Sequence, residues 1–266
     1  MSEHRCRLTR REALGRGASI LGALAFGPDS MHSAGAQGTA GSARLTSRPS
    51  TPTEPRPNGK VRFDVAGSSA AAWFPPVPAA GAARPLILFL HGANRTVDVF
   101  LDRHIPIAAE TGCIVLAPFA REGSWDAIGS GEFAADPRIL DASLRWVFQR
   151  ALVDPSRILI SGFSDGGTYA LAIGRANGDL FPRIAAYSPG YLIDVAAVRR
   201  PAVLISHGTD DTILPIERTS RVIVPKLRRA GYEVDYREFD GPHAVRTEIV
   251  AEIARNLARD RSPRRG

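Results

Sequence analysis

Residues 157 to 167 read Arg157-Ile158-Leu159-Ile160-Ser161-Gly162-Phe163-Ser164-Asp165-Gly166-Gly167 and place a serine inside the pattern G-x-S-x-G. The apolar run at its start predicts a buried strand, and the residues after it are compatible with a helix. A serine in this strand-turn-helix context predicts a nucleophile elbow, a strained turn that lifts the hydroxyl above the edge of a sheet. The glycines two residues on either side of Ser164 would let strand and helix approach closely.

A serine nucleophile needs a histidine base and a carboxylate that orients the histidine, and in this pattern they follow in the order Ser, Asp, His. The run Ala202-Val203-Leu204-Ile205-Ser206-His207-Gly208-Thr209-Asp210-Asp211 predicts a strand that ends in an acidic loop. We select Asp211 as the acid, with Asp210 as the alternative if the loop is shifted by one residue. Residues 234 to 239 alternate like a strand and lead to His243, the predicted general base.

Two backbone N–H groups must stabilise the oxyanion that such a reaction develops. One comes from the residue after the nucleophile, which is Asp165. The other is expected after an earlier strand, where residues 86 to 90 lead into His91-Gly92-Ala93-Asn94. We assign it to Ala93, with Asn94 as the close competitor. His91 and His207 are expected to brace their loops by hydrogen bonds.

Predicted strands and helices alternate along most of the chain, which favours an α/β fold with a parallel sheet covered on both faces. Two strands at 61 to 65 and 70 to 74 are expected to be antiparallel. The expected parallel strands are 86 to 90, 113 to 117, 157 to 161, 183 to 187, 202 to 206 and 233 to 239. The expected helices are 99 to 111, 137 to 152, 166 to 177, 216 to 230 and 246 to 259.

Five segments in this order resemble the α/β-hydrolase superfamily, in particular its phospholipase/carboxylesterase branch and related small esterases of the dienelactone-hydrolase and polyhydroxybutyrate-depolymerase type. They are residues 90 to 93, 153 to 158, 162 to 167, 207 to 211 with Pro215, and 241 to 243. The resemblance implies a mostly parallel central sheet without a large lid. It also implies a serine esterase that works through an acyl-enzyme. The family pattern places the acid four residues after the second His-Gly histidine, which supports Asp211. Dienelactone hydrolases proper use cysteine as the nucleophile, and Ser164 departs from them.

The amino-terminal region has the layout of an export signal. Arg10-Arg11 precede a moderately apolar stretch from Ala18 to Phe26, which resembles a twin-arginine signal, with cleavage expected after Ala36. Residues 37 to 59 are rich in Gly, Ser, Thr, Pro and Arg and predict a disordered linker. The hydrolase domain is then expected over 60 to 260, with a basic tail at 261 to 266. This layout predicts a periplasmic or extracellular protein.

The net charge of the 266 residues is +7 and falls to +5 without residues 1 to 36, which hold five arginines and three acidic residues. The charges are scattered without interleaved aromatic residues, which favours a solvated surface over a nucleic-acid partner. The sequence has no P-loop, G-x-G-x-x-G or metal-ligand cluster, so we expect no cofactor and no metal. Cys113 lies in an apolar run and predicts a small buried thiol.

Residues 118 to 136 form one long loop that is expected over the pocket. Trp125 and Phe133 in this loop either line an acyl or aromatic subsite or pack the loop onto the sheet, and Tyr191 raises the same question. We assign Trp125 and Tyr191 as substrate-binding candidates. The predicted partner is a small-molecule ester, with no stable membrane insertion. The alternatives to a carboxylesterase are a thioesterase or lipase, a serine peptidase of the prolyl-oligopeptidase type, and a non-catalytic binding protein.

Overall fold

The computed structural model describes residues 42–76, 81–93 and 97–259. The predicted export signal, the basic tail and Asn94 lie outside these residues, so the export route and the location of the protein stay predictions. Within the described ranges, no helix combines the length and the apolar character that crossing a membrane requires.

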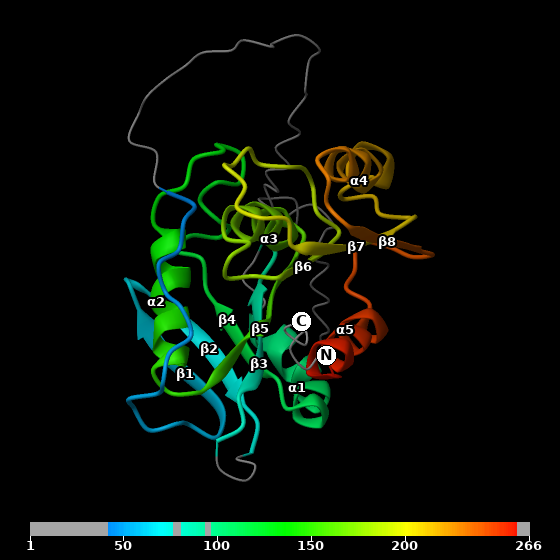
Figure 1. The fold of residues 1–266 in the computed structure, drawn as a ribbon. Helices are drawn as coiled ribbons and strands as arrows, with labels where there is room; N and C mark the ends of the chain where they lie inside the picture. Colours follow the sequence, from blue (N-terminus) through cyan, green and yellow to red (C-terminus); the bar gives the residue numbers. More distant parts are fainter. Residues whose placement is uncertain (1–41, 77–80, 94–96, 260–266) are drawn as a thin grey trace, which may run out of the picture. The chain divides into compact units, whose positions relative to one another are not determined.

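The centre of the domain is an eight-stranded sheet with the order β1-β2-β4-β3-β5-β6-β7-β8 (Figure 1). β1 pairs with β2, and β2 with β4, in antiparallel fashion, whereas all other neighbours are parallel. The prediction of a mostly parallel sheet with antiparallel strands at its amino-terminal edge is confirmed. The strands are β1 Gly59–Val65, β2 Ser68–Phe74, β3 Arg84–Leu90, β4 Ile114–Pro118, β5 Val153–Phe163, β6 Arg183–Tyr187, β7 Ala202–Gly208 and β8 Val234–Phe239.

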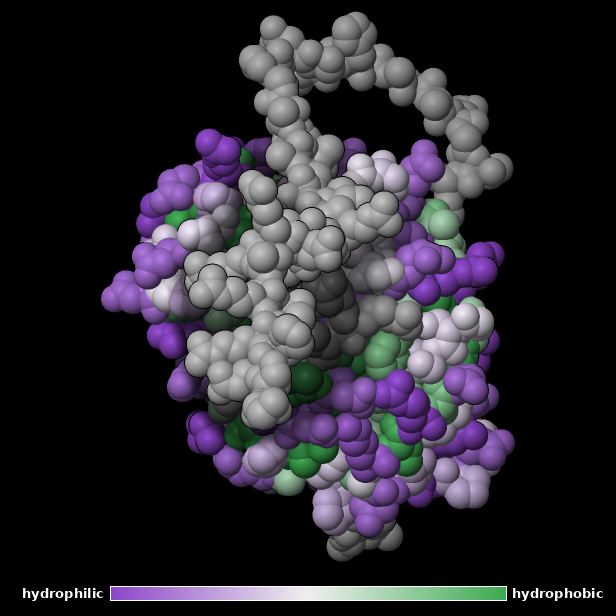
Figure 2. All heavy atoms as spheres, turned by 180° about the vertical axis from the view of Figure 1, so that it is seen from behind, coloured by the Kyte–Doolittle hydropathy of each residue, from purple (hydrophilic) through white to green (hydrophobic). Residues whose placement is uncertain are grey.

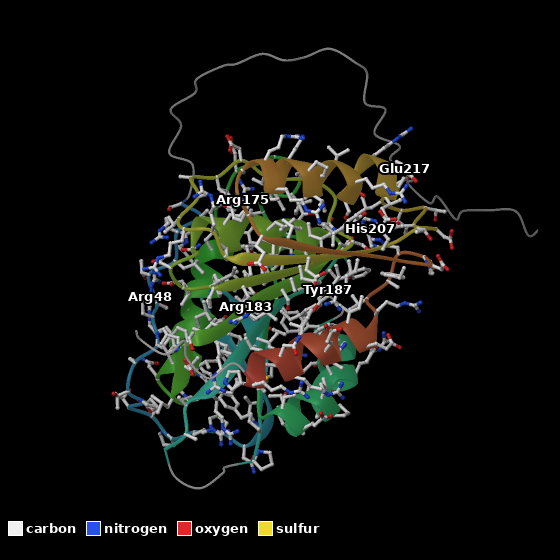
Figure 3. The ribbon with its side chains drawn as sticks, turned by 45° about the vertical axis from the view of Figure 1, so that its right-hand side comes forward. Arg48, Arg175, Arg183, Tyr187, His207 and Glu217 are labelled. Carbon is white, nitrogen blue, oxygen red and sulfur yellow. The ribbon has the colours of Figure 1, made fainter. Side chains whose placement is uncertain are left out.

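Helices cover both faces of the sheet, as Figure 3 shows with the sheet seen nearly edge-on. Core side chains of α1 and α5 pack with Ile87 and Phe89 of β3, while Leu86, Leu88 and Leu90 pack on the opposite side with α2, α3 and α4. A strand buried on both faces must be apolar throughout, which explains the unbroken apolar run of β3. The helices are α1 Val97–Thr111, α2 Asp136–Phe148, α3 Asp165–Ala176, α4 Ser220–Arg229 and α5 Thr247–Arg259.

The single helix predicted over 216 to 230 is wrong, because two elements occupy this range. A 3-10 turn, η1 Ile216–Arg218, comes first, and α4 starts only at Ser220. Thr219 between them has φ −121° and ψ −100°, which is not a helical conformation. Its hydroxyl donates to the Pro215 carbonyl oxygen at 3.0 Å, and such a local side-chain bond competes with a continuing helix.

Cys113 occupies the position that the sequence predicts for it. Its side chain is buried before β4, and burial raises the pKa of its thiol to about 11. A thiol that stays protonated at neutral pH is a weak nucleophile, so Cys113 is a packing residue.

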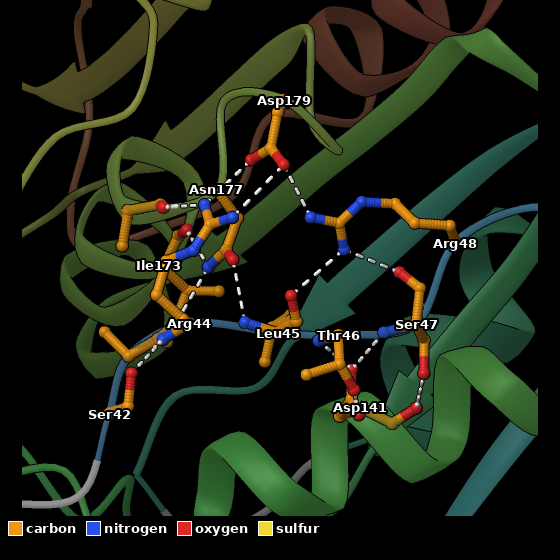
Figure 4. A network of polar contacts seen from close by, with 12 residues as sticks. Ser42, Arg44, Leu45, Thr46, Ser47, Arg48, Asp141, Ile173, Asn177 and Asp179 are labelled. Carbon is orange, nitrogen blue, oxygen red and sulfur yellow. Dashed lines mark hydrogen bonds and ion pairs between the residues drawn. The ribbon is translucent and has the colours of Figure 1, made fainter.

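Residues 42–58 contain no helix or strand, yet hydrogen bonds fix them on the domain. Figure 4 shows these bonds for the first part of the range, around Arg44 to Arg48. Leu45 is only 2% exposed and belongs to the main core. Its backbone N–H donates to Asn177 Oδ1 at 2.8 Å, and Asn177 Nδ2 donates to the Ala43 carbonyl oxygen at 2.8 Å. We call residues 42–58 the amino-terminal strap.

Two carboxylates hold the amino-terminal strap further. Asp141 on α2 accepts the backbone N–H groups of Thr46 and Ser47, both at 2.7 Å. Burial alone would raise the pKa of Asp141, but the bonds from Ser47 and Thr46 outweigh it and hold the pKa below its usual range. Asp179 pairs with Arg44 and Arg48 at 2.8 and 2.5 Å. The disordered linker predicted over 37 to 59 is therefore wrong for residues 42–58, because side chains of the domain bind backbone groups of residues 43–47 and the Gln149 carbonyl oxygen accepts the N–H groups of Thr53 and Glu54. Its other residues, 37 to 41, are not described, and β1 already begins at Gly59.

The visible described surface in Figure 2 is mainly hydrophilic, with smaller hydrophobic areas between the polar residues. Many exposed cations of the described residues are paired, including Arg221 with Glu238 at 2.7 Å and Arg255 with Glu110 at 2.8 Å. Exposed pairs of this kind contribute little to stability, but they neutralise much of the arginine charge locally.

Candidate active site

Ser164 connects β5 to α3 with a backbone conformation that few non-glycine residues adopt. Its φ is 57° and its ψ is −120°, which costs conformational energy unless the surroundings enforce it. They do so on both sides, because the Ser164 N–H donates to the Tyr187 carbonyl oxygen at 2.9 Å and the Thr168 N–H donates to the Ser164 carbonyl oxygen at 3.0 Å. The strained strand-to-helix turn predicted from G-x-S-x-G is confirmed.

The two glycines of the pattern leave no room for a side chain. A Cβ atom built on Gly162 would lie 2.1 Å from the Gly166 carbonyl oxygen. A Cβ atom on Gly166 would lie 2.1 Å from the Leu90 carbonyl oxygen. Both obstacles are backbone atoms, which cannot rotate away, so the close approach of β3, β5 and α3 depends on these two residues.

We expect Gly166→Ala to lower the free energy of unfolding by about 3 kcal/mol or more, because its methyl group overlaps the β3 backbone. Urea unfolding followed by circular dichroism measures this. Gly123→Ala is the matched control, since a Cβ atom there meets nothing within 4 Å, and it should stay within about 0.5 kcal/mol of the natural chain. Equal stability of the two variants would contradict the packing described for the elbow.

The predicted acid and base are in direct contact. Asp211 follows β7, His243 follows β8, and the distance from His243 Nδ1 to Asp211 Oδ2 is 2.6 Å. Asp211 is 4% exposed, and its Oδ1 accepts the N–H groups of Ile213 and Leu214 at 2.9 and 2.8 Å. Burial would raise the pKa of Asp211, but the Leu214 and His243 bonds outweigh burial and lower it. The carboxylate is therefore held ionised and in one orientation.

His207 also contacts the acid, which the sequence reasoning did not anticipate. Its Nε2 lies 3.0 Å from Asp211 Oδ2 and 2.8 Å from the Leu214 carbonyl oxygen, while its Nδ1 lies 2.7 Å from Ser220 Oγ. Both acceptors near Nε2 require the proton on that nitrogen. The ring is fully buried beneath α4 (Figure 3), and burial lowers its pKa, so it is neutral at pH 7. The prediction that His207 braces its loop is confirmed.

The serine and the histidine lie at one edge of the sheet. The His243 ring packs on Phe163, the residue before Ser164, with 4.6 Å between ring centroids. A Cβ atom on Gly92 would lie 3.2 Å from Ser164 Cβ, so the loop after β3 closes the other side of the serine. No hydrogen bond joins Ser164 Oγ to His243 in the described part of the chain. Such contacts of enzymes often tighten only when substrate binds. That Ser164, Asp211 and His243 act together stays a prediction.

The loop after β3 is held by His91. Its Nε2 accepts the Ala120 N–H at 3.0 Å, so the proton lies on Nδ1, which donates to the Gly92 carbonyl oxygen at 2.6 Å. This confirms the bracing role of His91. Ala93 follows in an exposed turn. Asp165 is the first residue of α3, so its backbone N–H has no hydrogen-bond partner within the helix. These positions suit the oxyanion roles assigned to Ala93 and Asp165, which remain predictions.

The long loop predicted over 118 to 136 lies between β4 and α2 and is fixed against α3. Ser124 Oγ donates to Asp165 Oδ2 at 2.5 Å. Trp125 is 1% exposed and its Nε1–H donates to the His91 carbonyl oxygen at 2.8 Å. Its indole thus supports the His91 loop from the core, so the packing alternative describes Trp125. The assignment of Trp125 as a substrate-binding residue is therefore wrong, because the side chain is buried. Phe133 is buried as well.

Tyr191, the second substrate-binding candidate, lies at the surface. It is 42% exposed, and its hydroxyl accepts the Gly129 N–H of the long loop at 2.8 Å. Gly190 donates its N–H to Thr168 Oγ1 at 2.8 Å, which ties the preceding turn to α3 behind the elbow. A contact between Tyr191 and substrate stays a prediction. No group of three or more His, Cys, Asp and Glu side chains among the described residues is placed to hold a metal ion.

Several solved structures with a similar fold are esterases or serine hydrolases. A thermostable esterase is 25% identical with a TM-score of 0.55, covering 68% of this chain and 55% of the esterase. FphF, a fluorophosphonate-binding serine hydrolase of Staphylococcus aureus, is 14% identical with a TM-score of 0.59. The match covers 77% of this chain and 100% of FphF. Thermogutta terrifontis esterase 2, phosphorylated by paraoxon, is 18% identical with a TM-score of 0.56. The match covers 75% of this chain and 92% of the esterase. No protein-family model matches the sequence, and no curated protein does.

Proposed function

We propose that this chain, which has the α/β-hydrolase fold, is a serine esterase that cleaves small or medium carboxylic esters through an acyl-enzyme. The observation that carries the proposal is the hydrogen bond between His243 and the buried Asp211 beside the strained elbow of Ser164. Because His243 Nδ1 is occupied by Asp211, the nitrogen available to the serine is Nε2, as general-base catalysis requires.

The reaction would run in two steps. His243 Nε2 takes the Ser164 proton while Oγ attacks the ester carbonyl carbon, and the Asp165 and Ala93 N–H groups stabilise the oxyanion. His243 then gives the proton to the departing alcohol, which leaves an acyl group on Ser164. A water molecule, deprotonated by His243, attacks that acyl group, and His243 returns the proton to Ser164 Oγ as the acid is released. Asp211 stabilises the imidazolium in both steps.

The esterase proposal is favoured over a lipase because the described residues from β5 to β7 contain no helix besides α3 that could form a lid, and the longest connection there, residues 188–201, has no helix or strand. A peptidase is separated from an esterase by comparing hydrolysis of a peptide 4-nitroanilide with that of a 4-nitrophenyl ester. A binding protein would leave Ser164 unreactive.

The experiment that tests the proposal is covalent labelling with a fluorophosphonate probe, which reacts with an activated serine hydroxyl. We expect one equivalent of label on the peptide that contains Ser164, located by mass spectrometry. Ser130→Ala, which changes an exposed loop serine, should be labelled like the natural chain. A chain that folds but takes up no label on Ser164 would refute the activated nucleophile.

A further inference from the structure

A cleft of about 240 Å³ lies directly beside His243. One side is formed by Phe163 at the end of β5 and by Gly92 and His243 of the neighbouring loops. The opposite wall is helix α1, which contributes Arg103 and His104. A group attached to an ester at Ser164 therefore meets α1 when it enters this cleft. The side chains of α1 there decide which groups fit.

The charge of this cleft has one sign. Its titratable described lining residues are Arg103, His104 and His243, and no carboxylate is among them. Arg103 is exposed and has no hydrogen bond or ion pair within the described ranges. Its cationic neighbours differ, since Lys60 pairs with Asp102 at 2.7 Å and Arg62 pairs with Asp98. Arg103 is thus a cation left unneutralised at the cleft, where the protein neutralises others close by.

His104 is a second polar residue in the lining of this cleft. It is 3% exposed, and its Nδ1 donates to the Phe100 carbonyl oxygen at 2.7 Å, which leaves Nε2 as an acceptor. Nε2 is buried and has no hydrogen-bond partner among the described residues. Burial and the charge of Arg103 lower the pKa of His104, opposed by the Phe100 bond, so the ring stays neutral. An unsatisfied buried acceptor costs free energy, which a hydrogen-bond donor on a ligand, such as a hydroxyl or an amide N–H group, would recover. A carboxylate carries no donor, so any attraction of a carboxylate to this cleft comes from Arg103.

Resting on the esterase function proposed above, we propose that this cleft selects esters that carry a carboxylate, which Arg103 binds through its guanidinium. A carboxylate matches the planar donors of arginine better than a neutral group does. The charge can sit on the acyl side or on the alcohol side of the ester, because either part can point away from Ser164. Arg103 is then a substrate-binding residue, and it takes no part in bond breaking.

The test measures binding in a Ser164→Ala background, so its outcome does not depend on turnover. Calorimetry compares monoethyl glutarate, with the carboxylate on the acyl side, and N,O-diacetylserine, with it on the alcohol side, against the carboxamide of each. We expect at least one carboxylate to bind about tenfold more tightly than its carboxamide. Adding Arg103→Met should remove this preference. The control adds Arg229→Met, which changes an exposed arginine at the end of α4 that has no ion pair with any described residue, and it should keep the preference for the carboxylate.

Equal affinity for carboxylate and carboxamide, an absence of measurable binding, or a preference that survives Arg103→Met would overturn the inference. The esterase function fails on a different result, namely the absence of hydrolysis and of Ser164 labelling in the natural chain. A carboxylate preference that depends on Arg103 would stand even then, because it is measured without the nucleophile.

Discussion

The Ser164→Ala variant is expected to hydrolyse 4-nitrophenyl butyrate at least about 10⁴-fold more slowly than the natural chain. Without Oγ no acyl-enzyme forms, and water must attack the bound ester directly. What remains is the contribution of substrate binding and of the oxyanion donors. The fold should persist, because alanine preserves the Cβ atom that already fits between Gly92 and the elbow. Initial rates at saturating ester, with circular dichroism of both proteins, measure the effect.

The control for this experiment is the Ser130→Ala variant, which keeps the nucleophile and should keep the natural rate. A Ser164→Ala protein that is folded and hydrolyses the ester within tenfold of the natural rate would exclude Ser164 as the nucleophile. The esterase proposal would then be wrong.

Asp211→Asn is expected to lower kcat by about 10³- to 10⁴-fold while the protein stays folded. The Oδ1 atom of asparagine can keep the Ile213 and Leu214 bonds, which places the amide NH₂ where Oδ2 now faces His243 Nδ1. A donor at that place forces the proton onto His243 Nε2, so the ring can no longer accept the serine proton. The same NH₂ also meets the proton on His207 Nε2. Steady-state kinetics with 4-nitrophenyl butyrate measure the loss.

Asp210→Asn is the matched control for Asp211→Asn. Asp210 is the adjacent acid, is exposed, and makes no side-chain hydrogen bond or ion pair in the described part of the chain. Its variant should keep kcat within about twofold, as surface substitutions usually do. If Asp210→Asn were the inactive variant and Asp211→Asn the active one, the assignment of the acid would be reversed.

The sheet could be predicted from the sequence because each parallel strand is an apolar run that ends in a glycine-rich or polar loop. β6 Arg183–Tyr187 has the predicted bounds, and β4 Ile114–Pro118 differs by one residue at each end. β5 begins four residues earlier than predicted, because Val153 already pairs with Arg84 before a register shift. Such pairing depends on the neighbouring strand, which local patterns do not reveal.

The site could be predicted only as far as local motifs extend. The elbow conformation and the contact between Asp211 and His243 follow the motif order. The burial of Trp125 could not be foreseen, because a loop aromatic looks the same in sequence whether it packs inward or faces substrate. Arg103 had no sequence signal, since only the packing of α1 against the sheet brings it to the cleft.

The amino-terminal strap has a practical consequence for anyone who shortens this protein for crystallisation. A recombinant version that begins at Gly59 would expose the core side chains on which Leu45 packs. It would also leave Asn177 and Asp141 without the backbone N–H groups that they bind in the strap. Such a version would aggregate more readily, whereas one that begins at or before Ser42 keeps the strap that covers these apolar side chains.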